Sequence, residues 1–219
     1  MKDAIDDLRF LLNRGYNRNS AVNFVANKYR LRIKDRNFLV RAVFSRSEAK
    51  EHKKKRVDIK KIKGREVVID GYNVLIAVES ALKGKEVILC DDGFVRDTSA
   101  TFGKYKLSKF TLPAVEKIIK ILKNNSASRV LFIFDSQVSF SGELCRLIRE
   151  KLAEHALNGD AVTSRSADYI ITKSKGIVCT SDRAVIKKAA KILDIPYYIQ
   201  VEKGSWPSQD MAPAFYPRS

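Results

Sequence analysis

Four short apolar runs that each end at an aspartate constrain the fold of this chain more than any other feature. They occupy residues 66–70, 85–92, 129–135 and 176–182. Segments with helical spacing lie between and after them, at 112–123, 142–157 and 184–193. Continuous apolar strands are expected where both faces of a sheet are buried, and their alternation with helices favours a mostly parallel sheet. The sequence therefore predicts a three-layer α/β domain over residues 65–202, with a last strand at 197–201.

The first part of the chain has a different pattern. Apolar residues recur at helical spacing in three stretches of residues 1–50, with short turns between them. Three short helices resemble a helix-turn-helix arrangement, and a plain helical bundle that packs on the α/β domain is the alternative. Residues 51–64 follow as a basic linker or helix. Residues 203–219 contain three prolines and are predicted to be irregular.

Positive charge is concentrated in this first part. Residues 1–64 hold 19 Lys and Arg against 7 Asp and Glu, a net charge of +12, and the whole chain has a net charge of +17. A protein this basic attracts polyanions, because neutralised phosphates release their counterions. A nucleic-acid partner is therefore favoured over a merely basic surface. The candidates for phosphate contacts are Lys53, Lys54, Lys55 and Arg56, for which a solvated helix face is the alternative.

The cysteines and the hydropathy pattern exclude several other classes of protein. Cys90, Cys145 and Cys179 lie in or beside apolar runs and form no CxxC pair, so we expect core thiols and no disulfide framework. The chain starts without an apolar leader and has no apolar window of membrane-spanning length. These features predict a cytoplasmic protein without membrane contact; its oligomeric state is open, and a homodimer is one option.

Aspartates at strand ends are the candidates for chemistry. Asp70, Asp135 and Asp182 follow three of the predicted strands, and ligands of parallel α/β sheets bind at the carboxyl ends of the strands. Neighbouring carboxylates repel each other unless a cation lies among them, and a site without His or Cys favours Mg²⁺ or Mn²⁺. An aspartate after a strand is more commonly a turn residue or a helix cap, and this alternative applies most directly to Asp182.

Four segments resemble motifs of the PIN-like nuclease superfamily, in its NYN branch, and they occur in that superfamily's order. They are residues 67–75, with Asp70 and Asn73; residues 130–135, ending at Asp135; residues 166–171, where Asp168 opens a helix; and residues 177–183, with Thr180, Ser181 and Asp182. The N-terminal helical region is also similar to the front of an uncharacterised prokaryotic family with this architecture.

The resemblance implies a Rossmann-like PIN fold and Mg²⁺- or Mn²⁺-dependent hydrolysis of phosphodiester bonds, of RNA rather than DNA. Position by position, it implies an acidic metal site of Asp70, Asp135, Asp168 and Asp182. Asn73 would hold the first loop or bind a phosphate or a water of the metal. Thr180 and Ser181 would orient Asp182 or touch phosphate. Arg165 and Arg183, beside the acids, are candidates for phosphate contacts or for salt bridges with the carboxylates.

The sequence departs from the superfamily in the long stretch of residues 79–109. Asp92 and Gly93 stand between two apolar runs there, which predicts a hairpin turn; a role for Asp92 as a metal ligand or in shaping the groove is the alternative. Glu116 is a secondary candidate for a helix-borne acid, against a solvated residue. Tyr72 is either a base-stacking residue or part of the core. A non-catalytic nucleic-acid-binding or regulatory protein with a degenerate PIN-like domain is the alternative function.

Overall fold

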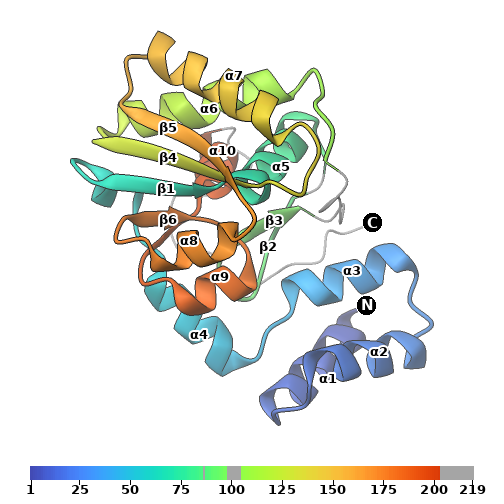
Figure 1. Ribbon diagram of the computed structural model, residues 1–219. Helices are drawn as coiled ribbons and strands as arrows, with labels where there is room; N and C mark the ends of the chain where they lie inside the picture. The colour runs from blue at the N-terminus through green and yellow to red at the C-terminus, as the bar shows by residue number, and fades with distance from the viewer. Residues whose placement is uncertain (86, 98–104, 203–219) are drawn as a thin grey trace.

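The main sheet has five parallel strands. The computed structural model describes residues 1–85, 87–97 and 105–202, and it is an α/β structure preceded by a helical region (Figure 1). The strand order is β5-β4-β1-β6-β7, and every neighbouring pair is parallel. The strands are β1 (Glu66–Asp70), β4 (Arg129–Asp135), β5 (Gly159–Ser164), β6 (Ile177–Cys179) and β7 (Ile192–Leu193). The expectation of a mostly parallel α/β sheet is confirmed.

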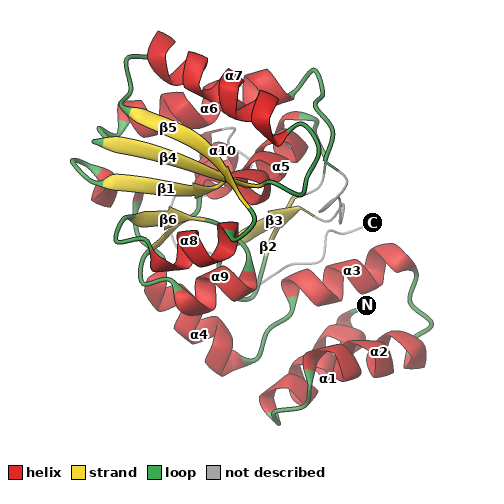
Figure 2. Cartoon of the chain, viewed as in Figure 1, coloured by secondary structure: helices red, strands yellow, loops and turns green. Residues whose placement is uncertain are grey.

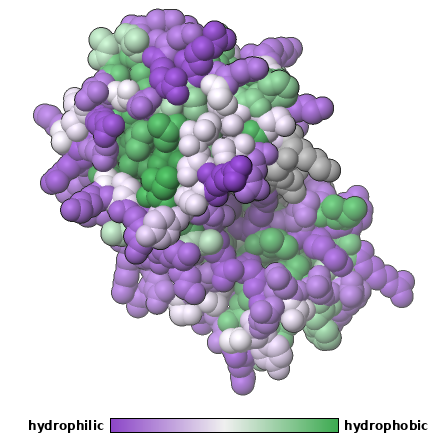
Figure 3. Space-filling model, in the orientation of Figure 1, coloured by the Kyte–Doolittle hydropathy of each residue, from purple (hydrophilic) through white to green (hydrophobic). Residues whose placement is uncertain are grey.

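Helices cover both faces of this sheet, as Figure 2 shows. One face packs against α5 (Gly71–Leu82), α6 (Thr111–Asn124), α7 (Ser141–Glu154) and α10 (Ile195–Glu202), and the other against α8 (Ala167–Lys173) and α9 (Arg183–Lys188). Strand β1 is apolar on both faces for this reason. Val67 and Ile69 belong to the first core and Val68 to the second. Figure 3 shows an apolar area over β4 and β5, between α7 and α8.

The helical region consists of four helices. They are α1 (Lys2–Asn13), α2 (Arg18–Lys28), α3 (Ile33–Ala42) and α4 (Arg46–Lys55), so α4 runs across the predicted boundary at residue 50. Asn17 caps α2, and Ser45 caps α4. A 3₁₀ helix (Ile59–Ile62) then leads into β1. In the described part of the chain, no helix has the length and apolar character needed to cross a membrane.

A separate two-stranded antiparallel sheet joins the helical region to the α/β part. It consists of β2 (Val87–Leu89) and β3 (Val95–Asp97). The predicted turn at Asp92 and Gly93 is confirmed, because Gly93 has a φ of +80° and its N–H donates to the Cys90 carbonyl oxygen at 2.9 Å. Ile88 and Cys90 complete the core of α1–α4. The helices therefore share a hydrophobic core with this hairpin.

Two expectations from the sequence were wrong, and one strand was missed. Residues 197–201 belong to α10, and the last strand is β7. The helix predicted to reach residue 193 ends at Lys188. Strand β5 was not anticipated, because its residues are mostly half-buried on the edge of the sheet and do not form an apolar run. The predicted irregular tail, residues 203–219, lies outside the described residues.

Candidate functional site

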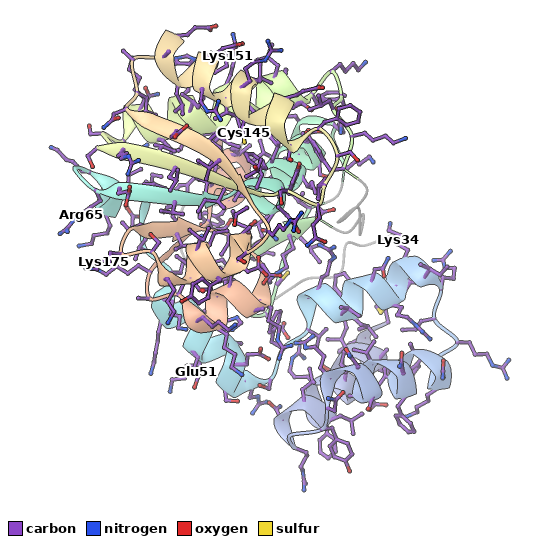
Figure 4. The ribbon with its side chains drawn as sticks, viewed as in Figure 1. Lys34, Glu51, Arg65, Cys145, Lys151 and Lys175 are labelled. Carbon is purple, nitrogen blue, oxygen red and sulfur yellow. The ribbon has the colours of Figure 1, made fainter. Side chains whose placement is uncertain are left out.

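The predicted acids lie at one end of the parallel sheet. Asp70 is the last residue of β1 and Asp135 the last residue of β4, and these strands are neighbours. Asp182 follows β6, the neighbour of β1 on its other side, and Asp168 lies in the first turn of α8. Arg65 and Lys175, labelled in Figure 4, mark the opposite end, where β1 and β6 begin.

The charges of neighbouring carboxylates affect the pKa values of Asp70 and Asp168. Burial, together with the charges of Asp182 and Asp168, raises the pKa of Asp70 to about 7, against hydrogen bonds from Thr180 and from the Asn73 backbone that lower it. Partial burial also raises the pKa of Asp168, as do the charges of Asp182 and Asp135. The four groups therefore lie close enough to repel one another, and a cation in their midst would relieve this repulsion.

The same carboxylates do not form a tight coordination group. In residues 1–85, 87–97 and 105–202, no three Asp, Glu, His or Cys side chains lie close enough together to hold one ion. Two of the acids also act as the turn and cap residues that the sequence offered as an alternative. Asp182 Oδ1 accepts the N–H groups of Ala184 (2.8 Å) and Val185 (3.0 Å) at the start of α9. Asp135 Oδ1 accepts the N–H of Gln137 at 2.8 Å.

Polar residues around Asp70 fix the two loops that carry the acids. Thr180 Oγ1 donates to Asp70 Oδ2 at 2.7 Å and accepts the Asp182 N–H at 3.0 Å. Asn73 Oδ1 accepts both the N–H and the hydroxyl of Ser181, each at 2.8 Å. Thr180 thus links Asp70 directly to the backbone of Asp182, while Asn73 ties the start of α5 to the loop after β6.

A groove of about 420 Å³ opens beside these residues. Asn73, Ser181 and Asp182 form one side, and α2 and α3 form the other with Arg18 and Arg41. Further lining residues are Asn19, Val40, Phe44, Ile76, Arg96, Asp97 and Arg183. The groove lies between the helical region and the acidic edge of the sheet, so both parts of the chain contribute to it.

Arg18 is the most unusual side chain of this groove. It is 10% exposed and donates to the carbonyl oxygens of Val40 (2.9 Å) and Val43 (2.7 Å), while its Nε has no hydrogen-bond partner. Burial lowers its pKa to about 10, and the charge of Arg183 contributes. Two guanidinium groups therefore lie near each other, with Glu48 between them as a shared carboxylate partner.

The structure gives the predicted basic residues different positions. Arg183 forms a salt bridge with Glu48 of α4. The salt-bridge alternative is therefore right in kind, but the partner is not one of the four acids. Lys55 Nζ donates to the carbonyl oxygens of Ile186 (2.9 Å) and Lys187 (2.6 Å) of α9. Arg56 donates to the Gly93 carbonyl oxygen and lies over the Tyr197 ring. Lys53, Lys54 and Arg165 are exposed.

Asp92 is a buried structural residue. Its two carboxylate oxygens accept from Arg96, both at 2.7 Å, and Oδ2 also lies 2.8 Å from His52 Nδ1. Although burial opposes ionisation, the charge of Arg96 and the hydrogen bonds hold the pKa of Asp92 well below its usual range. Arg96 Nε in turn donates to the Ser181 carbonyl oxygen at 2.7 Å. Because both oxygens of Asp92 are engaged, this carboxylate is not free to bind a metal. Through Arg96, the cluster instead supports the loop that carries Ser181 and Asp182.

Glu116 lies away from the acids, and Tyr72 is part of the core. The Glu116 carboxylate is 3.8 Å from Lys151 Nζ. Lys151 is ten residues beyond Ser141, the first residue of α7, and it lies at the top of Figure 4, far from the acidic edge. Tyr72 is 3% exposed and packs against Tyr105 and Phe134, so it belongs to the core and is not available to stack on a base.

Glu79 is a buried carboxylate that was not predicted from the sequence. Thr111 Oγ1 (2.8 Å), Ser108 Oγ (2.9 Å) and Lys83 Nζ (2.6 Å) all donate to it, as does the Tyr105 hydroxyl. The signal was present, because Glu79 is the only charged residue of the apolar helix α5. These hydrogen bonds join α5 to the start of α6, and they leave the carboxylate fully engaged.

Comparison with known proteins places the chain in a family. A family model described as a domain of unknown function (DUF5616) matches residues 59–198, and one described as a protein of unknown function (DUF434) matches residues 1–55. An uncharacterized protein of Methanocaldococcus jannaschii is 39% identical over 187 residues, which cover 85% of this chain and 89% of that protein. No solved structure matches the chain. The chain therefore belongs to the DUF5616 family, with a DUF434 segment ahead of the family's domain.

Proposed function

We propose that this protein is a metal-dependent nuclease with a PIN-like fold, and that it cleaves RNA in preference to DNA. One observation carries the proposal: four aspartates, at the ends of β1 and β4, in the first turn of α8 and at the start of α9, lie at the carboxyl edge of the sheet beside a groove lined by arginines. Acidic groups that face a basic groove suit a polyanionic substrate and a cation together. The preference for RNA rests on the resemblance of the four motifs.

The donor atoms fit Mg²⁺ or Mn²⁺, although their spacing does not enclose an ion. Carboxylate oxygens are the ligands that these hard cations prefer, and Mg²⁺ is commonly held by one or two carboxylates while it keeps several waters. Asp70 and Asp182, linked through Thr180, are the pair that would hold it, with Asp135 and Asp168 nearby. When bound, the ion would polarise a phosphoryl oxygen and make a water more acidic.

The other residues of the site position and bind. Thr180 and Asn73 hold the loop of Asp182 against Asp70, so the two carboxylates are already oriented before a ligand binds. Arg41, which also pairs with Asp97, would contact a phosphate of the substrate strand on the opposite wall of the groove, and the buried Arg18 would add positive charge there. Arg183 would contribute its charge there while it remains paired with Glu48.

The test is cleavage of labelled single-stranded and structured RNA and DNA with Mn²⁺, with Mg²⁺ and with EDTA. D70N preserves an acceptor for the Thr180 hydroxyl, and D182N preserves the cap of α9, because Asn caps helices as well as Asp does. D160N is the control, since Asp160 lies near the amino end of β5 and pairs with Arg149.

The wild type and D160N are expected to cleave RNA only with metal. D70N and D182N are expected to cleave at least about a hundredfold more slowly, because losing a charged oxygen ligand of the metal raises the activation barrier by roughly 3 kcal/mol. Metal-independent cleavage, or equal rates in D70N and wild type, would exclude the proposed site. RNA binding without cleavage under every condition would favour the non-catalytic alternative.

A further inference from the structure

One face of α4 carries a row of cations, and among the described residues of this helix the exposed Glu51 forms no ion pair with them. Arg46, Lys50 and Lys54 recur at intervals of four residues, and Lys53 lies beside them. Like charges four residues apart on a helix destabilise it. All four side chains are exposed, and within the described part of the chain none has an ion-pair partner. The acidic Glu48 lies on the other side of this helix and reaches Arg183 of α9.

These cations line a second pocket, of about 700 Å³. Arg9 of α1, Phe44, Ala49 and Asp91 of the hairpin complete its lining. Asp91 adds no free negative charge, because Arg9 donates to both of its oxygens at 3.0–3.1 Å and the Phe44 N–H donates to one of them. Figure 3 shows hydrophilic surface around α4. The pocket therefore presents four cations that form no ion pair within the described residues, around a partly apolar floor.

We infer that this pocket binds several phosphate groups of a nucleic-acid strand. The row from Arg46 to Lys54 extends about 12 Å along the helix, at 1.5 Å per residue, which is longer than a single phosphate group. Lysine side chains bind phosphates as flexible point charges, and the guanidinium of Arg46 can bind a phosphate through two N–H groups. A polyanion also offsets the repulsion within the row, since its binding releases counterions.

The pocket is distinct from the acidic edge but mechanically connected to it. Phe44 lines both the pocket and the groove beside Asp182. The opposite side of α4 is fastened to α9 at both ends, through Glu48 with Arg183 and through Lys55 with the carbonyl groups of α9. A strand held on α4 would therefore lie at a fixed distance from the proposed nuclease site. Binding to the pocket does not depend on the carboxylates being catalytic.

The experiment measures binding of a fluorescein-labelled single-stranded RNA by anisotropy over a range of salt concentrations, with full-length D70N so that no cleavage occurs. The triple variant K50Q/K53Q/K54Q removes three charges from the pocket and keeps helix-forming side chains. K60Q/K61Q/K63Q is the matched control, because these exposed lysines precede β1 at the opposite end of the sheet. Circular dichroism checks that both fold.

The pocket variant is expected to bind about tenfold more weakly than D70N alone. Its slope of log affinity against log salt is expected to fall by about 2, because each phosphate of a single strand that the protein no longer neutralises lowers the slope by roughly 0.7. The control is expected to change both quantities much less. Equal decreases in the two triple variants, or no decrease in the pocket variant, would overturn the inference. So would pocket-dependent binding of phosphatidylserine vesicles or polyglutamate by a protein that binds no RNA.

Discussion

Gly71 is the residue at which the fold leaves least room beside the carboxylates. A Cβ atom there would lie 2.3 Å from Cε1 of Phe134, whose ring is 1% exposed and packs on Tyr72. Because the ring has no free space to move into, we expect G71A to lower the free energy of unfolding by about 1–3 kcal/mol.

Gly142 is the matched control for this substitution. A Cβ there would meet nothing within 4 Å, and the residue lies in α7. G142A is expected to be neutral or to stabilise by up to about 1 kcal/mol, since alanine restricts the unfolded chain more than glycine does. Urea unfolding of both variants measures the difference, and equal stabilities would contradict the close approach of Phe134.

We expect Asp194 to make the stability of the protein depend on pH, separately from the proposed site. It is 1% exposed, and its oxygens accept the N–H groups of Val95 (2.8 Å) and Tyr197 (3.2 Å). Burial raises its pKa to about 6, against the charge of Arg56 and these hydrogen bonds. At pH values below 3.8, the ordinary pKa of this group, Asp194 is protonated in both the folded and the unfolded states.

As the pH rises from about 4 to 6, the unfolded chain loses this proton before the folded chain does. The contribution of Asp194 to the free energy of unfolding therefore falls in that window, by up to about 1.4 kcal/mol per pH unit. We expect the stability of wild type relative to D194N to decline over this range. Parallel stability curves for the two proteins, from urea unfolding at each pH, would show that Asp194 is ionised at pH 4 already.

At the scale of elements, strands buried on both faces were predictable and elements fixed by tertiary packing were not. β1 and β4 read as apolar runs because helices cover both of their faces. β5 is an edge strand, and half-burial leaves Asp160 and Thr163 in it. Residues 197–201 have the aromatic and β-branched composition of a strand, yet Asp194 accepts the Tyr197 N–H, Pro196 fits a first turn, and α10 packs on α5.

The acidic site was predictable to the same extent. Strand ends placed Asp70 and Asp135 at one edge, because neighbouring parallel strands end together. For Asp92 the sequence predicted a hairpin turn and left a metal-ligand role as the alternative; the pairing of β2 with β3 and the hydrogen bonds from Arg96 show that its carboxylate is already engaged. The arginines of the groove carry no motif, because α2 and α3 bring them to the site through tertiary packing.

The hairpin element depends on its buried ion cluster. D92A would leave the Arg96 guanidinium buried, 6% exposed, without its carboxylate. Removing one partner of a buried pair costs about 3–5 kcal/mol, and we expect a decrease of that order in urea unfolding. R9A is the comparison, because Arg9 is 25% exposed and its removal leaves Asp91 with the Phe44 N–H. A decrease under about 1 kcal/mol in D92A would mean that water reaches Arg96.

At the scale of the whole molecule, the two family segments are expected to fold as one unit. Ile88 and Cys90 of the hairpin lie in the core of α1–α4, Arg9 pairs with Asp91, and Arg41 pairs with Asp97. α4 is also fastened to α9. Interactions of this kind couple the parts, because unfolding α1–α3 alone would expose apolar side chains of the hairpin and leave Asp91 buried without a charge partner.

We therefore expect one cooperative transition in urea, followed by far-ultraviolet circular dichroism, and native-state hydrogen exchange with similar opening free energies for core amides of α1–α3 and of β1 and β4. A chain that begins at residue 46 is expected to be much less stable, since it lacks the cover of Ile88 and Cys90. The contrary result is an α1–α3 segment that exchanges several kcal/mol more easily than β1. In that case the arginine wall of the groove would detach from the acidic edge without global unfolding, and the helices would act as a separate RNA-binding module.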